Sequence, residues 1–345
     1  LSKENNVSII TLSENNVNYD NSIYEVKRII RKQNRLIRFI KTFFLIIKFG
    51  KNSDIIFING LWLEAFLANL LLKKKTIRKF VGDPVWEKYY SQYKISDGFD
   101  EFQNKKYSII IEFYKYIRNL SLKSINTVVV PSKHLLNFVK STGFNGNLIE
   151  INNGTINSRV IKKNYDNNKF LIVSRLVRQK NIDLIIKSFE VLRNKHSLEF
   201  SLQIIGTGPE YENIKTLIKD LKLNDSINLV GSKFGKELET YYRDANYLLQ
   251  ISSYEGMSHT ILEAMDHGLV VITSKFGGNY ELIGKNELGY LVEPIEVDQI
   301  VNTIDFVLKD NEKKVKALEG KDLVNKDYNI MFTSKKYAEM ITNSE

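Results

Sequence analysis

The stretch "KFLIVSRLVRQKNIDLIIKSFEVLRNK", residues 169–195, joins a short apolar run to a longer amphipathic one. The first run is nearly continuous in Phe, Leu, Ile and Val, which is typical of a parallel strand that is buried on both faces. In the second run apolar residues recur at helical spacing, at Ile182, Ile185, Ile186 and Phe189. The stretch therefore predicts a strand followed by a helix, the repeating unit of doubly wound α/β folds.

The same alternation continues on both sides of this stretch. After it, the strand-like runs "FSLQIIGTG", "SINLVGS" and "NYLLQIS" alternate with the helix-like runs "PEYENIKTLIKDL" and "KELETYYRDA". Before it, "VSIITL", "DIIFIN", "TIRKFVG" and "TVVVPS" alternate with helical runs, one of them strongly basic. We expect two Rossmann-like α/β domains, residues 1–160 and 161–320, joined through the polar segment Thr155–Asn168, with only helices beyond Glu293.

Composition restricts the class of protein. The 345-residue chain has no cysteine, which excludes disulfides, iron–sulfur clusters and thiolate zinc sites and fits a reducing compartment such as the cytoplasm. Its longest apolar runs are about six residues, well below the roughly 20 that a spanning helix needs. Residues 1–160 hold 25 Lys and Arg against 13 Asp and Glu, and the rest hold 25 against 27. The first half therefore favours an anionic partner, with membrane phospholipid, nucleic acid and phosphorylated substrate all admissible.

The stretch "SSYEGMSHTILEAMDHG" places two glutamates around the start of a predicted helix. Ser258 is a candidate N-cap, and free backbone N–H groups from Met257 to Thr260 would favour a phosphate or a sugar oxygen. Glu255 lies at the carboxyl end of a strand, where open α/β sheets bind ligands, and Glu263 lies about one turn into the helix. Two carboxylates suit the hydroxyls of a sugar or ribose better than a phosphate. The alternative is that both are solvated surface charges.

Two other loops also follow predicted strands. The loop "VSRLVRQKN" contains Arg175 and Lys180, which leave one strand and precede a helix, so both cations can converge on a diphosphate. The loop "IIGTGPE" contains Gly206 and Gly208, which permit a tight turn and close packing, but it lacks the third glycine of a dinucleotide fingerprint. Each loop alone is weak evidence for a site.

Together, "SRLVRQKNIDLII", "IIGTGPE", "INLVGS" and "YRDANYLLQISSYEGMSHTILEAMDHGLVV" closely resemble the C-terminal half of the retaining GT-B glycosyltransferases of family 4, the glycosyl transferases group 1. The resemblance covers about residues 169–310 and includes the spacing of Glu255 and Glu263. It implies the GT-B fold, in which two Rossmann-like domains face each other across a cleft and a C-terminal helix, residues 321–345, crosses back to the first domain. The implied reaction moves a hexose-type sugar from a nucleotide-diphosphate sugar to a glycan or lipid-linked acceptor, in cell-surface polysaccharide or glycolipid biosynthesis.

The resemblance also implies roles for individual residues. Arg175 and Lys180 would stabilise the diphosphate as it leaves, in catalysis with Glu255, which would face the donor sugar. Glu263 would bind the ribose hydroxyls. The other implied donor-binding residues are Gly206, Gly231, Gly256, Met257 and Ser258. The acceptor would attack from the face of the leaving group, so the anomeric configuration is retained. The chain has no Asp-x-Asp sequence and its four histidines form no metal-ligand pattern, so we expect neither a metal nor a cofactor.

The first half of the chain matches the family less closely. Where most members have a histidine after the fourth strand, "KFVGDPVWEKYY" offers Asp83, which we expect to act in catalysis on donor or acceptor hydroxyls. Trp86 and Glu87 are acceptor-side candidates, since aromatic and carboxylate groups suit sugar faces and hydroxyls. The alternative is a helix N-terminus with a buried tryptophan. Family members also carry a first strand and a glycine-rich loop ahead of the part that "LSKENNVSIITL" resembles, so we expect this chain alone to be inactive or destabilised.

Seven Lys and Arg lie between Lys27 and Lys41, in a run that predicts a basic helix from Tyr24 to about Lys48. This helix either lies on an anionic membrane surface, as a peripheral cytoplasmic enzyme would, or packs on the sheet with its cations in water. Two rival functions are a nucleotide-sugar epimerase or sugar phosphorylase on the same fold, and a basic non-enzymatic protein that binds nucleic acid or membrane. We identify neither the extra acid–base residues of the first nor a nucleic-acid-binding module, and we expect no nucleic-acid partner.

Overall fold

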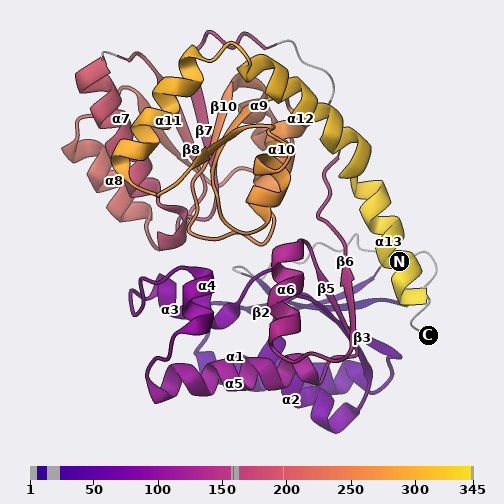
Figure 1. The fold of residues 1–345 in the computed structure, drawn as a ribbon. Coiled ribbons are helices and arrows are strands. Elements are labelled where there is room, and N and C mark those ends of the chain that lie inside the picture. The colour runs from indigo at the N-terminus through magenta and orange to yellow at the C-terminus, as the bar shows by residue number, and fades with distance from the viewer. Residues whose placement is uncertain (1–5, 14–23, 157, 159–162, 197, 343–345) are drawn as a thin grey trace.

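The computed structural model describes residues 6–13, 24–156, 158, 163–196 and 198–342. Two α/β units lie one above the other in Figure 1, the N-terminal unit below and the C-terminal unit above. Every strand pair in both units is parallel, which is the arrangement of sheets whose faces are covered by crossover helices. Among the helices of these residues, none combines the length and the apolar character needed to cross a bilayer.

The C-terminal unit is built on a six-stranded sheet with the order β12-β11-β10-β7-β8-β9. Its strands are β7 (Lys169–Val173), β8 (Ser201–Ile205), β9 (Ile227–Gly231), β10 (Tyr247–Gln250), β11 (Val270–Ser274) and β12 (Tyr290–Val292). The chain runs outward from β7 to β9 and then places β10 on the other side of β7. This is the Rossmann strand order, and its direction reverses between β7 and β10. Ligands of such sheets bind at this switch point, beyond the carboxyl ends of the strands.

The N-terminal unit contains a four-stranded sheet, β3-β4-β5-β6, and a separate two-stranded sheet, β1-β2. Its strands are β1 (Ser8–Ser13), β2 (Glu25–Ile30), β3 (Ile55–Ile58), β4 (Lys75–Lys79), β5 (Thr127–Val130) and β6 (Asn147–Glu150). The prediction of a helix from Tyr24 is wrong over this second strand. The β-branched residues Val26, Ile29 and Ile30 pair with β1 in the structure. The helix begins only at Arg35, where the Asn34 side chain accepts a hydrogen bond as its N-cap.

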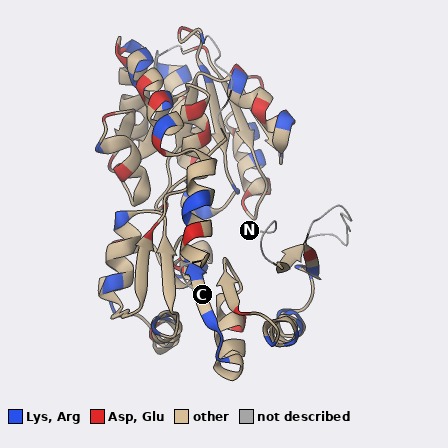
Figure 2. Cartoon of the chain, turned by 90° about the vertical axis from the view of Figure 1, so that its right-hand side faces the viewer, with Lys and Arg blue, Asp and Glu red and all other residues tan. Residues whose placement is uncertain are grey.

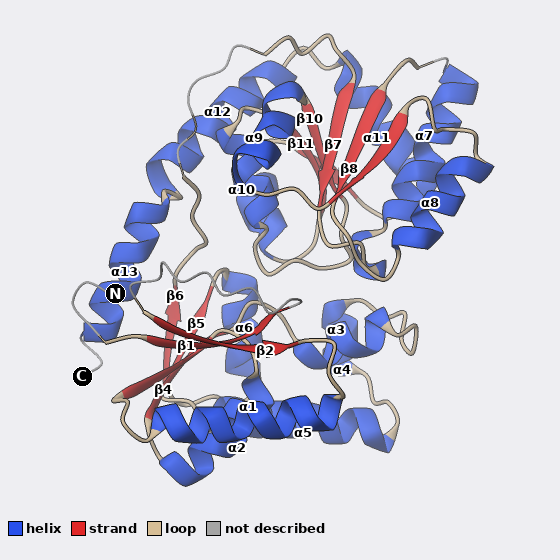
Figure 3. Ribbon diagram, turned by 180° about the vertical axis from the view of Figure 1, so that it is seen from behind, coloured by secondary structure: helices blue, strands red, loops and turns tan. Residues whose placement is uncertain are grey.

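Helices cover the sheets of both units (Figure 3). In the N-terminal unit they are α1 (Arg35–Gly50), α2 (Trp62–Leu72), α3 (Pro84–Ser91), α4 (Phe99–Asn104), α5 (Ile109–Lys123) and α6 (Lys133–Ser141). The C-terminal unit has α7 (Ile182–His196), α8 (Tyr211–Asp220), α9 (Gly235–Asp244), α10 (His259–Asp266) and α11 (Val297–Lys309), with the short segments η1 (Arg178–Lys180) and η2 (Tyr280–Gly284). Two helices follow, α12 (Lys313–Asp327) and α13 (Ile330–Thr342).

The last two helices connect the C-terminal unit to the N-terminal one. Val324 of α12 is buried in the core of the C-terminal unit. Met340 of α13 packs with Ile77 and Val129 of the N-terminal sheet, and the ring of Tyr337 lies edge-on to Phe57. The C-terminal helices therefore return to the N-terminal unit, as the family resemblance implies.

Candidate active site

The residues predicted for the donor site lie at the carboxyl ends of the C-terminal strands. Arg175 follows β7 and Glu255 follows β10, and these two strands are neighbours at the switch point. Gly206 follows β8, and Gly231 ends β9 with a φ of +84°. Because the strands are parallel, all four positions share one edge of the sheet. The sequence-based grouping of these residues therefore corresponds to one place in the fold.

Glu255 is fixed by a set of short contacts. Its Oε1 accepts hydrogen bonds from Gln250 Nε2 at 2.8 Å and from Ser252 Oγ at 3.0 Å, and it forms an ion pair with Lys180. The side chains of Glu255 and Lys180 are 17% and 16% exposed, so the pair is enclosed but still open to a ligand. Arg175, on the neighbouring strand end, is exposed. The structure thus places Arg175 and the Glu255 of a preformed ion pair at the carboxyl ends of neighbouring strands.

The start of α10 lies in the loop that follows this pair. Ser258 caps the helix as predicted, since its Oγ accepts a hydrogen bond from the N–H three residues later. The expectation that the first amides are free is wrong for Ser258, whose N–H donates to Asn279 Oδ1 at 3.3 Å. Met257 is buried, and its carbonyl accepts a hydrogen bond from Asn153 Nδ2 at 2.9 Å. Side chains that are distant in the sequence therefore hold this loop, and local sequence gives no sign of them.

Two of the predicted glycines lie where another backbone approaches closely. A Cβ on Gly256 would lie 2.1 Å from the carbonyl oxygen of Val81, which belongs to the N-terminal unit. A Cβ on Gly206, whose φ is +142°, would lie 1.8 Å from the carbonyl oxygen of Ser174. Only glycine fits at either position without a shift of the backbone. The loop at Gly256 is therefore in direct contact with the opposite unit.

Glu263 lies on α10 and is half-buried. Its Oε2 accepts a hydrogen bond from the hydroxyl of Tyr242 at 2.7 Å. Burial of Tyr242, together with the negative charge of Glu263, raises the pKa of the Tyr242 hydroxyl well above its usual value. The hydroxyl therefore stays protonated and donates, which fixes the orientation of the Glu263 carboxylate. Tyr242 was not among the residues expected from the sequence, although "ETYYRDA" places two tyrosines on the preceding helix.

The structure corrects the catalytic role predicted for Asp83. Asp83 is fully buried, and its Oδ1 accepts a hydrogen bond from the Val85 N–H at 2.9 Å as the N-cap of α3. Its Oδ2 accepts a hydrogen bond from Gln103 Nε2 at 3.0 Å and forms an ion pair with Arg118, which is itself 3% exposed. Both oxygens are therefore occupied by protein groups, and neither faces a ligand. Arg118 lies 35 positions away in the sequence, so the local motif could not reveal this pairing.

Trp86 is likewise not an acceptor-facing residue. Its side chain is 1% exposed, its indole N–H donates to the Asp97 carbonyl at 3.0 Å, and its ring packs against Tyr90 and Phe99. The alternative of a buried tryptophan behind a helix N-terminus is the correct one. A large aromatic side chain at the third position of a helix is often the one that turns into the core, because apolar faces bury first.

Glu87 differs from these two residues, because its side chain is exposed. It lies on α3, the helix that packs against η1 of the C-terminal unit. Desolvation in the cleft and the negative charges of Asp83 and Glu255 raise its pKa to about 7, against the opposing effect of Lys180 and Arg175. Water that reaches the exposed carboxyl screens part of this effect. Because α3 contacts η1, the segment that ends at Lys180, Glu87 and Lys180 belong to elements that meet between the two units.

Tyr254, next to Glu255, is an important residue that was not expected from the sequence. It follows β10 of the C-terminal unit but lies in the core of the N-terminal unit, 6% exposed. Its ring stacks on Phe99, with centroids 3.9 Å apart, and meets Trp86 edge-on. Such aromatic contacts contribute roughly 0.5–1.5 kcal/mol each beyond the area they bury. The only available signal was an aromatic residue in an otherwise polar loop.

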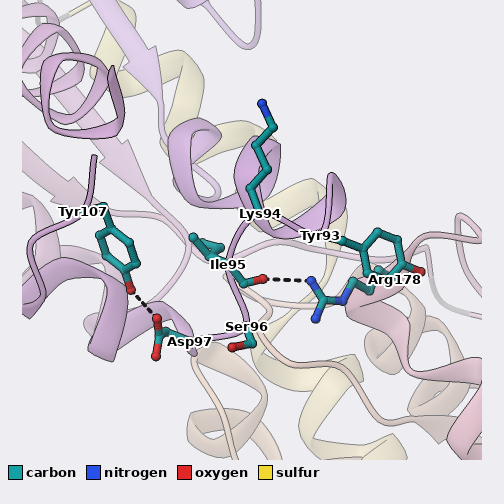
Figure 4. Close-up of a pocket in the computed structure, with 7 residues that line it drawn as sticks. All are labelled: Tyr93, Lys94, Ile95, Ser96, Asp97, Tyr107 and Arg178. Atoms are coloured by element: carbon teal, nitrogen blue, oxygen red, sulfur yellow. Dashed lines mark hydrogen bonds between the residues drawn. The ribbon is translucent and has the colours of Figure 1, made fainter. Parts of the chain in front are cut away.

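Two charged residues complete the contact between the units. Glu281 of η2 accepts hydrogen bonds from the Lys133 and His134 N–H groups, at 2.9 and 2.6 Å, and so caps α6 across the interface. Arg178 donates to the carbonyl oxygens of Tyr90 and Ile95, at 3.0 and 2.8 Å. The close-up in Figure 4 shows Arg178 beneath the ring of Tyr93, at the edge of a pocket of about 280 Å³. These segments of the C-terminal unit are thus bound to the N-terminal unit at several points.

Comparison with known proteins matches part of this chain to glycosyltransferases. Residues 155–320 match the family model of glycosyl transferases group 1. The chain is 28% identical over 166 residues to an uncharacterized glycosyltransferase of Haemophilus influenzae. The aligned residues make up 48% of this chain and 46% of that protein. The chain is also 33% identical over 129 residues to the amylovoran biosynthesis glycosyltransferase AmsK of Erwinia amylovora. Here the aligned residues make up 36% of this chain and 31% of that protein. Each match thus spans less than half the length of the relative.

Solved structures resemble the whole described fold. Sucrose-phosphate synthase from Thermosynechococcus elongatus superposes with a TM-score of 0.79 at 18% identity, covering 97% of this chain and 88% of that one. Anabaena HepE in complex with UDP and glucose superposes with a TM-score of 0.73 at 15% identity, covering 93% of this chain and 87% of that one. At these identities the likeness shows the fold alone. The chain has the GT-B fold, and its segment 155–320 matches the glycosyl transferases group 1.

Proposed function

We propose that this chain is a retaining glycosyltransferase of family 4 that moves a hexose-type sugar from a nucleotide-diphosphate sugar to a glycan or lipid-linked acceptor. The observation that carries the proposal is that Arg175 and the Lys180–Glu255 ion pair follow two neighbouring strands, at the switch point of a Rossmann sheet that faces a second unit. Anabaena HepE, which shares this fold, was solved in complex with UDP and glucose, and this supports a donor of the same class. The similarity to AmsK, an amylovoran biosynthesis glycosyltransferase, supports a role in polysaccharide biosynthesis.

In the proposed reaction the bond between the anomeric carbon and the diphosphate breaks, and negative charge develops on the departing phosphate oxygen. Arg175 stabilises this charge together with Lys180, which keeps two N–H groups for phosphate while a third meets Glu255. Preorganised cations of this kind can lower a barrier by several kcal/mol. The acceptor hydroxyl attacks from the same face and passes its proton to the departing oxygen. The new glycosidic bond therefore keeps the original anomeric configuration.

The remaining predicted residues take supporting roles in this proposal. Glu263, oriented by Tyr242, accepts hydrogen bonds from the ribose hydroxyls of the donor. Glu255 holds Lys180 and faces the donor sugar, and Glu87 is the acceptor-side residue that we retain. The reaction in this form needs no metal and no cofactor, and we propose that the enzyme works in the cytoplasm at the inner face of the membrane, which it contacts through residues 24–48.

The experiment that tests the proposal is a panel of nucleotide sugars and nucleoside diphosphates assayed for thermal stabilisation of the protein. A ligand present at 100 times its Kd stabilises the native state by about 2.7 kcal/mol, which gives a clear rise in midpoint. The matching donor should then support transfer, and the variants Lys180→Met and Glu263→Gln should lose it. The control Lys285→Met, at an exposed lysine with no assigned role in the site, should keep it. If no nucleotide sugar or diphosphate stabilises the protein, the proposal is wrong. Nucleic-acid binding that is indifferent to Glu263→Gln would instead favour the non-enzymatic alternative.

A further inference from the structure

Helices α1, α2 and α5 form one layer on the side of the N-terminal sheet that faces away from the C-terminal unit (Figures 1 and 3). Within the described residues, 22 large apolar side chains are exposed, and 11 of them lie on these three helices. The helices are 16, 11 and 15 residues long, so they hold a small part of the chain and half of its exposed large apolar groups. An apolar surface of this kind marks an interaction site more often than chance.

Helix α1 is apolar on two opposite sides. Its inner side packs Ile46 and its neighbours into the core of the N-terminal unit. Its outer side exposes Leu36, Ile37, Ile40 and Phe44, of which Phe44 is 63% exposed. At about 100° per residue, these four positions fall on the side of the helix away from the sheet. A helix that only covered a sheet would place polar residues there, so the outer stripe lacks a structural explanation in the described chain.

Helix α5 repeats this pattern. Its inner side buries Ile111, Arg118 and Leu122, whereas the outer side exposes an apolar series at helical spacing. The exposed series is Ile109 at 88%, Ile110 at 60%, Phe113 at 58%, Tyr116 at 63% and Leu120 at 41%. Between the two stripes, α2 adds Leu70 and Leu71, which are 54% and 70% exposed. The outer stripes of α1, α2 and α5 are called the helical face below.

A hollow interrupts the helical face between α1 and α2. It has a volume of about 340 Å³ and is lined by Phe39, Ile40, Phe43, Phe44 and Leu67, all of them apolar. Apolar walls offer no hydrogen bonds to a sugar or a phosphate, so the hollow does not belong to the donor or acceptor site. Its size and lining suit hydrocarbon groups.

The charges of α1 have one sign, whereas α2 and α5 also carry one glutamate each in their first turns, Glu64 and Glu112. Residues 26–53 contain nine Lys and Arg and no Asp or Glu. Lys41 and Lys48 are exposed on the edge of the α1 stripe, and Lys123 is exposed at the end of α5. In Figure 2 the helix that follows the two N-terminal strands is seen end-on and carries blue Lys and Arg segments. The face therefore combines an apolar centre with a border in which cations predominate, most clearly along α1.

Resting on the proposed function, we propose that the helical face, and not α1 alone, docks on an anionic phospholipid bilayer. The apolar stripes of α1, α2 and α5 enter the boundary between headgroups and acyl chains, and the bordering lysines and arginines meet the lipid phosphates. A second copy of this chain is a poorer occupant, because a twofold contact would place the cations of residues 26–53 against the same cations of the other copy. A nucleic acid would satisfy the cations and leave the stripes exposed.

Docking in this orientation has a consequence for the site. The helical face and the interface between the units lie on opposite sides of the N-terminal sheet. The donor site therefore stays open to water when the protein is on the membrane, and donor binding does not depend on the lipid. A lipid-linked acceptor must span the helix layer and the sheet, each about 10 Å thick, to reach the site. Acceptors that already carry several sugars fit this geometry.

The test is co-sedimentation of the protein with vesicles of phosphatidylcholine, with and without phosphatidylglycerol, at low and high salt. Binding should require the anionic lipid and weaken with salt. Lys41→Gln/Lys48→Gln should lower the partition coefficient roughly thirtyfold, at about 1 kcal/mol per cation. Ile40→Ser/Phe44→Ser and Ile110→Ser/Phe113→Ser should each lower it about tenfold or more, since each removes two apolar groups from the bilayer boundary.

Matched controls use exposed positions outside the helical face. Leu318→Ser/Met331→Ser and Lys285→Gln/Lys314→Gln should bind vesicles like the unaltered chain. Equal binding to neutral and anionic vesicles, equal losses in the controls, or no binding at all would overturn the proposal. A dimer that Ile40→Ser/Phe44→Ser dissociates, or RNA binding that survives this variant, would also overturn it in favour of another occupant. Nucleotide-sugar stabilisation, measured on the same variants, should not change, and its absence from every protein would instead count against the proposed function.

Discussion

Replacing Asp83 by asparagine separates a structural role from a catalytic one. The variant Asp83→Asn keeps an oxygen for the N-cap of α3 but removes the only carboxylate charge that pairs with Arg118 among the described residues. Arg118 and the nearby Arg78 are 3% and 4% exposed, and burial already lowers the pKa of Arg78 to about 10. Removing one partner of a buried ion pair costs about 3–5 kcal/mol, because the other charge is left without compensation. This is a large part of the roughly 5–15 kcal/mol that typically stabilises a domain.

Urea unfolding followed by tryptophan fluorescence measures this loss directly. Both tryptophans of the chain, Trp62 and Trp86, lie in the N-terminal unit, so the signal reports on the unit that contains Asp83. The exposed Asp54→Asn in the same unit is the control and should unfold like the unaltered protein. Adding Arg118→Met to Asp83→Asn should recover part of the loss, since the buried pair is then removed as a whole. An unchanged midpoint in Asp83→Asn, together with a large loss of transfer, would refute the structural role and restore the catalytic one.

Three further variants test the site. Tyr242→Phe removes the hydroxyl that orients Glu263. A hydrogen bond to a charged group is worth about 1.5–3 kcal/mol, so the Kd for the nucleotide, measured by calorimetry, should rise roughly tenfold or more. An unchanged Kd would mean that the Glu263 carboxylate does not need the tyrosine hydroxyl. Gly256→Ala places a methyl group against the Val81 carbonyl, which should shift the loop and lower kcat about a hundredfold. Circular dichroism should show that both units are still folded. A kcat equal to that of the unaltered protein would show that the backbone can move to accommodate the methyl group. Glu87→Gln should change the pH dependence of stability. The folded carboxyl has a pKa of about 7, raised from 4.5, so the native state holds its proton more tightly and stability falls as pH rises through this interval. In urea unfolding at several pH values the fall should be smaller in Glu87→Gln, and an identical profile would contradict the raised pKa.

The predictable parts of this structure are those that depend on neighbouring residues. The run from Lys169 specifies β7 because its apolar residues are continuous, and α7 because Ile182, Ile185 and Ile186 repeat at helical spacing. The Ser258 cap follows from the same kind of local rule. The GT-B fold follows from the family resemblance, whereas the grouping of Arg175 with Glu255 follows once parallel strands are recognised, because the carboxyl ends of these strands share one edge. These features need no contact between distant parts of the chain.

The unpredictable parts depend on distant partners. Asp83 is next to a helix in the sequence, and only the fold brings Arg118 to it. Ser258 N–H is occupied by Asn279, which the chain supplies from the loop after β11. Val26 and its neighbours form a strand because β1 is available for pairing, whereas the many cations of the same segment suggested a helix. In each case a long-range contact decides between structures that the local sequence allows equally.

The junction of the units explains the sequence of the loop after β10. Tyr254 and Glu255 are adjacent, and successive residues of an extended loop point in different directions. The tyrosine ring turns into the aromatic core of the N-terminal unit, and the carboxylate turns back to Lys180 of its own unit. Gly256 then brings the backbone against the Val81 carbonyl. Three consecutive residues thus bring this loop into contact with both units. The position of Glu255 therefore depends on how the two units meet as well as on the Rossmann sheet from which the loop emerges.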